Sequence, residues 1–126
     1  MTPVLLNYNP ATTRYFGDTP SAGRLEGPGV ARGSAGSPAH GALVQFELRI
    51  EGGVVREARF TAFGCPHTIA VAAWTAEHAA GLPRGAGLPR SVAELSALFA
   101  VPIEKRGRLL VVEDAWAASM AAAPAP

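Results

Sequence analysis

Hydrophobic and polar residues alternate along residues 43–63 with the period of two that is typical of half-buried β-strands. In the first half of this stretch, the hydrophobic positions Val44, Phe46, Leu48 and Ile50 alternate with Gln45, Glu47 and Arg49. Gly52 and Gly53 follow, and a glycine pair favours the tight turn of a hairpin because glycine adopts positive φ without steric cost. The pattern predicts a β-hairpin over residues 43–63, with its turn at the two glycines.

Three helices are predicted after the hairpin, over about residues 66–80, 91–99 and 109–122. Pro66 suits the first turn of the first helix, where its missing N–H costs nothing. Ser91 followed by Glu94 is the pattern of a capping box at the start of the second. A hairpin followed by helices predicts an α+β fold, with a small antiparallel β-sheet and helices packed on one face.

Glycine and proline are concentrated between residues 22 and 42, which contain six glycines and two prolines. This composition is typical of a flexible segment, in which we expect one possible edge strand around residues 25–30. Residues 1–21 are predicted to form a short helical turn followed by a loop. With 126 residues the chain has room for one modest core, so we expect a single domain over residues 1–126.

The composition is that of a globular protein, with 48% hydrophobic and 17% charged residues and a net charge of +1. No run of basic residues is present, so neither nucleic acid nor an anionic membrane surface is an expected partner. The most apolar tract, residues 109–123, is interrupted by Glu113 and Asp114 and is too short to span a bilayer. The N-terminus lacks the pattern of a signal peptide, so we expect a cytoplasmic protein.

Cys65 is the only cysteine, so no internal disulfide can form. It lies at the predicted junction of strand and helix, where unpaired N–H groups and the helix dipole favour an anion. A thiol at such a position has a lowered pKa and can act as a nucleophile or metal ligand, whereas the alternative is a buried structural cysteine. His67 follows two residues later. Residues two apart on a helix point in different directions, so its contribution to a site stays open.

A longer motif surrounds Cys65 and extends from the end of the hairpin into the following helix. It consists of Ala58-Arg-Phe-Thr-Ala-Phe-Gly-Cys65, then Ile69-Ala70, Glu77 and Gly81, with Lys105, Glu113-Asp114-Ala115 and Tyr8-Asn9-Pro10 farther away. These residues resemble the IscU/NifU N-terminal family of scaffold proteins for iron–sulfur cluster assembly, which carries A-x-F-x-x-F-G-C, I-A and E-D-A motifs. The resemblance covers about residues 39–122 and implies the family's α+β fold.

The sequence departs from the family at two of its three cluster-binding cysteines. The family's first cysteine belongs to an A-C-G-D motif, and the matching residues here are Ala39-His40-Gly41-Ala42. The third falls on Arg108, with Gly107 before it where the family has a histidine. The family's chaperone-binding L-P-P-V-K is matched only in part by residues 101–105. Of the three positions, Cys65 alone keeps its cysteine.

The resemblance implies that Cys65 and His40 are candidate metal ligands and that Arg108 converges on Cys65 with His40. Imidazole replaces thiolate in some iron–sulfur and many zinc sites, whereas a guanidinium stays protonated and offers no free lone pair. Arg108 would instead stabilise a thiolate or persulfide on Cys65, and the alternative places it on the solvent face of a helix. The expected cofactor is iron or an iron–sulfur cluster, held weakly or with a partner's help, and zinc is a second candidate.

The function implied is that of a scaffold-like protein of iron–sulfur cluster assembly with an altered metal or sulfur site, which binds an intact cluster poorly by itself. The alternative is an interaction module that binds a cysteine desulfurase or another assembly protein without holding a metal. A third class is a thiol enzyme or sulfur carrier that uses Cys65. The sequence contains no serine–histidine–aspartate set, phosphate loop or reliably spaced acid–base pair, so we do not expect an enzyme.

Overall fold

The structure is a computed structural model that describes residues 8–123. Its elements, in chain order, are α1 (Pro10–Gly17), β1 (Val30–Ser37), the 3₁₀ turn η1 (Pro38–His40), β2 (Ala42–Glu51), β3 (Val54–Phe63), α2 (Pro66–Glu77), α3 (Val92–Leu98), the 3₁₀ turn η2 (Ile103–Lys105) and α4 (Gly107–Ala121). The order of strands followed by helices confirms the predicted α+β class.

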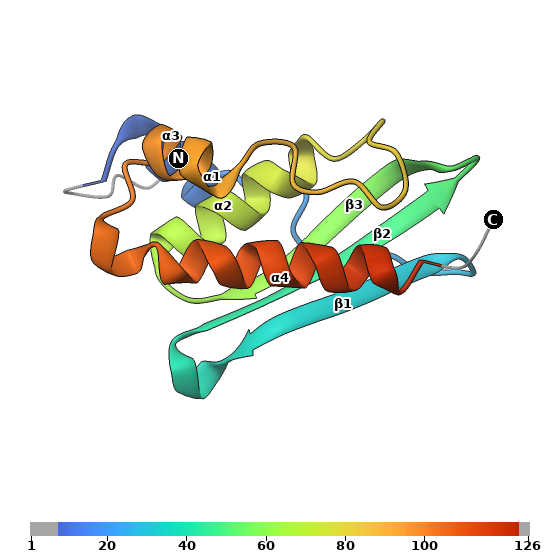
Figure 1. The fold of residues 1–126 in the computed structure, drawn as a ribbon, viewed down its shortest axis with the longest axis horizontal. Helices are drawn as coiled ribbons and strands as arrows, with labels where there is room; N and C mark the ends of the chain where they lie inside the picture. The colour runs from blue at the N-terminus through green and yellow to red at the C-terminus, as the bar shows by residue number, and fades with distance from the viewer. Residues whose placement is uncertain (1–7, 124–126) are drawn as a thin grey trace.

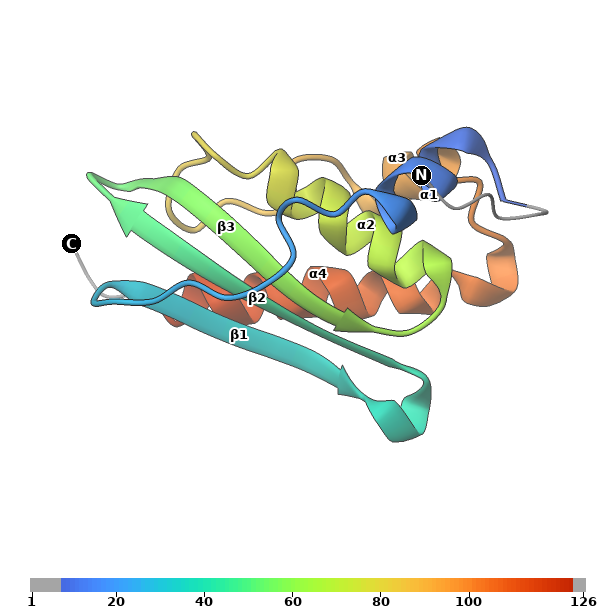
Figure 2. The same cartoon turned by 180° about the vertical axis from the view of Figure 1, so that it is seen from behind.

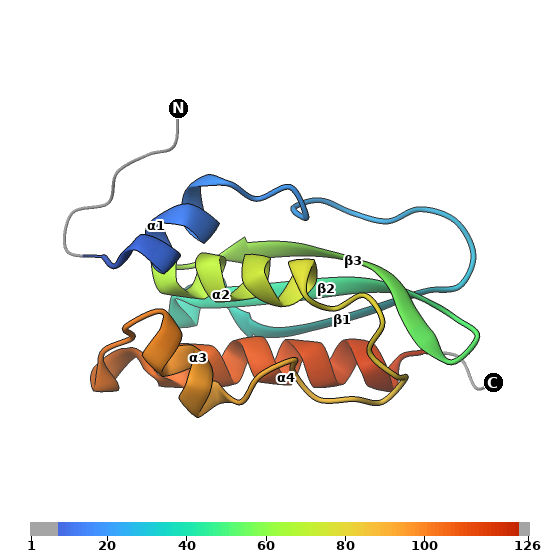
Figure 3. The same ribbon diagram turned by 90° about the horizontal axis from the view of Figure 1, so that it is seen from above.

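The three strands form one antiparallel sheet in the order β1-β2-β3. The predicted hairpin is confirmed as β2 and β3, with its turn at Gly52 and Gly53. α2 and α4 cover one face of the sheet, as Figures 1 and 3 show. Val44, Phe46 and Leu48 of β2 are fully buried between the sheet and the helices. Trp116 of α4 packs edge-on against Phe46 with ring centroids 5.4 Å apart. The core therefore lies between the sheet and these two helices.

The edge strand expected around residues 25–30 forms instead at β1, Val30–Ser37, so that prediction was wrong in position. The physical reason is the close approach of β1 to α4. A Cβ on Gly33 would lie 2.1 Å from the backbone nitrogen of Ser119, so only glycine allows this packing distance. The small residues that we took as a sign of flexibility make room for a helix.

The opposite face of the sheet is partly covered by the extended segment between α1 and β1, which crosses it in Figure 2. An isolated parallel bridge joins Ala22 to Phe60 of β3, and the backbone N–H of Leu25 donates to the buried carboxylate of Glu47 on β2. The segment therefore lies against the sheet through backbone and side-chain hydrogen bonds.

The predicted helices are present, with small changes at their ends. α2 ends at Glu77 rather than at residue 80, because the following turn pairs with β3: Gly81 N–H donates to the carbonyl of Val55, and Val55 N–H to that of Leu82, each at 2.8 Å. α3 carries the predicted capping box of Ser91 and Glu94. Among residues 8–123, no helix combines the length and the hydrophobicity needed to cross a membrane.

Candidate functional site

Cys65 lies at the junction of β3 and α2, as the sequence predicted. It is the N-cap of α2, with extended φ and ψ of −74° and 166°, and Pro66 is the first helical residue. The chain turns sharply at Gly64, which has φ of 155°, and a Cβ there would lie 3.1 Å from Cβ of Thr68 and 3.2 Å from the carbonyl oxygen of Gly41. Glycine therefore lets the strand end pass close to both, and it leaves the Cys65 thiol half-buried at the helix start.

Hydrogen bonds lower the pKa of the Cys65 thiol below its usual value. Burial alone raises this pKa, but it is outweighed by the backbone N–H and hydroxyl of Thr68, the guanidinium of Arg108 and the backbone N–H of His67. The Sγ atom lies 3.6 Å from Oγ1 of Thr68. These donors all favour the charged form of the sulfur, so the site favours a thiolate.

Arg108 reaches Cys65 from a different part of the chain. It is the second residue of α4, is half-buried, and its guanidinium lies near enough to Cys65 to lower the pKa of the thiol. A Cβ on Gly41 would lie 4.0 Å from Nη2 of Arg108, so the same side chain also borders the turn before β2. The start of α4, the turn before β2 and the start of α2 therefore meet at Arg108.

The His40 side chain is exposed and bonds a neighbouring serine. The β2–β3 register pairs Leu43 with Phe63, which places the turn before β2 beside the end of β3. The His40 side chain is nevertheless exposed, and its Nδ1 lies 2.9 Å from Oγ of Ser37. Its backbone N–H also donates to that hydroxyl, at 3.3 Å. Nδ1 is thus bonded to Ser37, and a ligand role for His40 remains a prediction.

His67 is buried beside this site, which sequence reasoning left open. The side chain is 4% exposed, and its ring packs against Tyr8 with centroids 4.8 Å apart. Burial lowers the pKa of His67, and the charges of Lys105 and Arg108 lower it further. Within residues 8–123, its Nδ1 has no hydrogen-bond partner. Whether the His67 side chain contributes to a site at Cys65 stays a prediction.

The donor set around Cys65 does not suit a metal cluster held by this chain alone. Among the residues that the structure describes, no three His, Cys, Asp or Glu side chains gather closely enough to share a metal ion. Iron–sulfur clusters and structural zinc normally take four protein ligands. The surroundings of Cys65 offer N–H donors and positive charge instead, and this arrangement suits an anionic sulfur.

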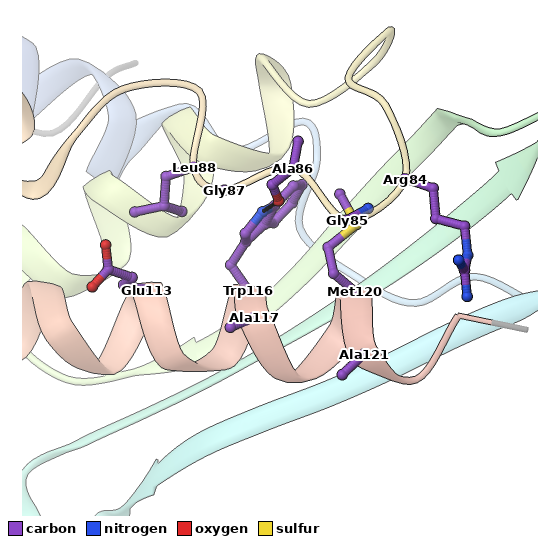
Figure 4. A pocket seen from close by; sticks show the side chains of 10 residues that line it. All are labelled: Arg84, Gly85, Ala86, Gly87, Leu88, Glu113, Trp116, Ala117, Met120 and Ala121. Atoms are coloured by element: carbon purple, nitrogen blue, oxygen red, sulfur yellow. Dashed lines mark hydrogen bonds between the residues drawn. The ribbon is translucent and has the colours of Figure 1, made fainter.

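A separate cavity of about 430 Å³ lies between α4 and the loop of residues 84–88 (Figure 4). Trp116 Nε1 donates to the carbonyl of Ala86 at 3.0 Å, and the N–H of Gly85 donates to Sδ of Met120 at 3.4 Å. These bonds hold the loop on the C-terminal half of α4, whereas Arg108 lies at its start. None of the residues predicted as ligands lines this cavity.

Comparisons with known proteins agree with this fold. The family of NifU-like N terminal domains matches residues 7–119. A curated relative, "Iron sulfur cluster assembly protein 1" of Trachipleistophora hominis, is 23% identical over 116 residues, which cover 90% of this chain and 84% of the relative.

Among solved structures, the N-terminal part of a nitrogen-fixing NifU-like protein from Brucella abortus has a TM-score of 0.69 at 18% identity, over 90% of this chain and 91% of that one. A candidate scaffold protein for iron–sulfur cluster assembly in the SUF system, from Fervidobacterium islandicum, has a TM-score of 0.55 at 17% identity. That match covers 61% of this chain and spans only 56% of the Fervidobacterium chain.

The fold and the cysteine at the strand–helix junction define a domain of the class that serves as scaffold in iron–sulfur cluster assembly. The chain belongs to the family of NifU-like N-terminal domains, as the match over residues 7–119 shows. The resemblance deduced from the sequence motifs is thereby confirmed.

Proposed function

We propose that this chain is a scaffold-like protein of iron–sulfur cluster assembly that carries sulfur on Cys65, as a thiolate or persulfide, and binds an intact cluster poorly by itself. The observation that carries the proposal is the position of the half-buried Cys65 thiol at the N-cap of α2, with Sγ 3.6 Å from Oγ1 of Thr68. Arg108 and the N–H groups at the start of α2 lower the pKa of this thiol. A persulfide is anionic and gains from the same donors and from the helix dipole. The chain then acts as a carrier rather than as an enzyme.

A metal ion is the less suitable cargo for this site. Arg108 is positively charged at any accessible pH, and it lies where a third anionic ligand would be needed. Any iron or zinc that Cys65 and His40 held would therefore be mononuclear and weakly bound, with water or a partner's residue completing the coordination. A cysteine desulfurase, or another assembly protein that carries a persulfide, is the proposed source of the sulfur.

Sulfur uptake tests the proposal. The purified chain is incubated without oxygen with glutathione persulfide, and intact-protein mass spectrometry counts the sulfur atoms added. We expect one added sulfur on the unaltered chain and none on Cys65→Ser. Arg108→Met should take up less sulfur, because fewer molecules carry a thiolate at neutral pH. An unaltered chain that takes up no sulfur would contradict the proposal.

A second function is favoured by the exposed apolar side chains at the Cys65 end of the molecule. Among residues 8–123, the exposed large hydrophobic side chains are Phe63, Leu98, Ile103 and Leu110. They lie at the end of β3, the end of α3, in η2 and at the start of α4, which share one end of the molecule in Figure 1. Exposed apolar side chains at one end of a molecule are candidates for a protein-binding surface.

This alternative is an interaction module that binds an assembly partner without handling sulfur or metal. The two functions differ in their dependence on the thiol. Cys65→Ser abolishes sulfur transfer under the first function, whereas it leaves function in cells unchanged under the second. Complementation of a deletion strain by Cys65→Ser therefore separates them.

A further inference from the structure

We propose that His67 is a binding residue for sulfane sulfur, whose imidazole holds the outer sulfur atom of a persulfide on Cys65. The inference rests on the proposed function and adds to it a specific residue and a specific bound species. It is carried by a buried imidazole nitrogen that the fold of residues 8–123 leaves without a partner.

A buried Nδ1 without a hydrogen-bond partner is unusual, because buried polar side-chain atoms in proteins nearly always have one. The His67 side chain is 96% buried, since only 4% is exposed, and its ring is covered by Tyr8. The ammonium of Lys105 lies 5.7 Å from the centroid of the Tyr8 ring, on the same small cluster. A buried nitrogen that no described residue satisfies is therefore available to a bound group.

The charges around His67 identify the kind of group. Lys105 and Arg108 both act on the imidazole electrostatically, and Arg108 also lowers the pKa of the Cys65 thiol. The backbone N–H of His67 is itself among the groups that lower the pKa of that thiol. Two cations and several N–H donors disfavour a metal ion and favour an anion. Because His67 is buried against Tyr8 and lies two residues from Cys65, the bound group that we consider is a small anion on the Cys65 sulfur.

A persulfide meets these conditions. Its outer sulfur lies one S–S bond, about 2.05 Å, beyond Sγ and carries the negative charge. Transfer proceeds by attack of the Cys65 thiolate on the outer sulfur of a donor persulfide, R–S–SH. The new S–S bond forms as the donor's S–S bond breaks, and the donor sulfur leaves with the electron pair and takes the proton. The step involves no net oxidation, and a protein or small-molecule persulfide supplies the sulfur.

The retention time of the added sulfur tests the inference. The unaltered chain and its variants are loaded anaerobically with glutathione persulfide, freed of excess donor and exposed to a fixed concentration of dithiothreitol, while mass spectrometry follows the loss of the sulfur. His67→Phe keeps an aromatic ring against Tyr8 but removes both nitrogens, and His67→Leu is a second loss variant in case the first folds poorly. We expect both to lose the sulfur about tenfold faster, the effect of one hydrogen bond to a charged group.

Two further variants separate a hydrogen bond from packing. His67→Asn places an amide N–H near the position of Nδ1, so it should hold the sulfur for longer than His67→Phe. His78→Leu removes a histidine from the opposite end of α2, where Nδ1 of His78 bonds the carbonyl of Trp74 at 2.8 Å, and it should behave like the unaltered chain. The alkylation rate of unmodified Cys65 should change by less than about twofold in all four variants, because the groups that lower its pKa stay in place.

The outcomes of this experiment distinguish the inference from the proposed function. If the unaltered chain accepts no sulfur, the proposed function fails. If it accepts sulfur but His67→Phe and His67→Leu retain it as long as the unaltered chain, only the inference about His67 is wrong. Equal loss from His67→Asn and His67→Phe would assign the effect to packing and would also overturn the inference.

Discussion

The carboxylate of Glu47 offers the sharpest test of how the sheet is covered. Its side chain is 1% exposed, beneath the segment that crosses the open face of the sheet. It accepts hydrogen bonds from Leu25 N–H at 2.8 Å, Arg24 Nε at 2.9 Å and Gln45 Nε2 at 3.0 Å, and it pairs with Arg32 Nε at 3.4 Å. The perturbation that we consider is Glu47→Gln, which keeps the size of the side chain and removes its charge.

The expected loss of stability follows from the exposure of the partners. Removing one member of a fully buried ion pair costs about 3–5 kcal/mol, because the other charge is left buried. Here the side chains of Arg24 and Arg32 are 67% and 46% exposed, so both can regain water. The remaining loss in the free energy of unfolding comes from the weakened bond to the buried N–H of Leu25 and from the lost charge-assisted bonds. Together these amount to about 2–3 kcal/mol.

Urea unfolding of the unaltered chain and of Glu47→Gln measures this difference in the free energy of unfolding. Glu57→Gln is the matched control, since the Arg59–Glu57 pair at 3.1 Å joins side chains that are 34% and 43% exposed. Such surface pairs contribute little, so the control should lie within about 0.5 kcal/mol of the unaltered chain. A Glu47→Gln variant that is equally close to the unaltered chain would refute the reasoning.

The pH dependence provides a second check. Burial raises the pKa of Glu47, but the Leu25 N–H and the two arginines lower it by more, so the net shift is downward. A lowered pKa means that the stabilisation is complete above the unfolded-state pKa, about 4.3, and is lost as the pH falls through the folded-state pKa. The difference between the two proteins should therefore be constant near neutral pH and shrink in acid. A difference that grows in acid would contradict the assigned charge.

Two other substitutions test the site and the sheet. Arg108→Met should raise the pKa of Cys65 and slow its alkylation at neutral pH by about fivefold, since a smaller thiolate fraction is partly offset by higher intrinsic nucleophilicity. Arg106→Met alters an exposed neighbour and should leave the alkylation rate unchanged. Equal rates in the unaltered chain and both variants would remove Arg108 from the site. Gly33→Ala should destabilise the fold by about 1–3 kcal/mol in urea unfolding, because its Cβ would collide with the α4 backbone. Gly107→Ala is the control, because a Cβ at that position would have no other atom within 4 Å. A Gly33→Ala variant as stable as Gly107→Ala would show that α4 can move away from β1 freely.

The hairpin and the position of Cys65 could be predicted because both depend on local patterns. A period of two and a glycine pair are sufficient for β2 and β3, and the proline after Cys65 marks the start of α2. The approach of Arg108 to Cys65 was predicted from the family resemblance rather than from any spacing rule. It depends on the packing of α4, which no local pattern specifies.

The position of β1 and the surroundings of the two histidines could not be derived in this way. β1 owes its position to contact with α4, and a glycine at a helix contact cannot be told from a glycine in a flexible loop by composition. His40 bonds a serine three residues away, a local contact that competes with the distant site. His67 is buried by Tyr8, which is far away in the sequence.

The central claim is tested most directly by anaerobic reconstitution of the purified chain with iron and sulfide, followed by absorbance spectroscopy and by analysis of iron and sulfide. Cys65 and His40 supply two candidate ligands where a cluster normally takes four, so we predict no stable chromophore and well under one cluster per chain. A variant with His40→Cys and Arg108→Cys, which restores the three cysteines of the family pattern, should hold more cluster than the unaltered chain. A stable chromophore at one cluster per unaltered chain would contradict the account and would assign this protein the ordinary scaffold role.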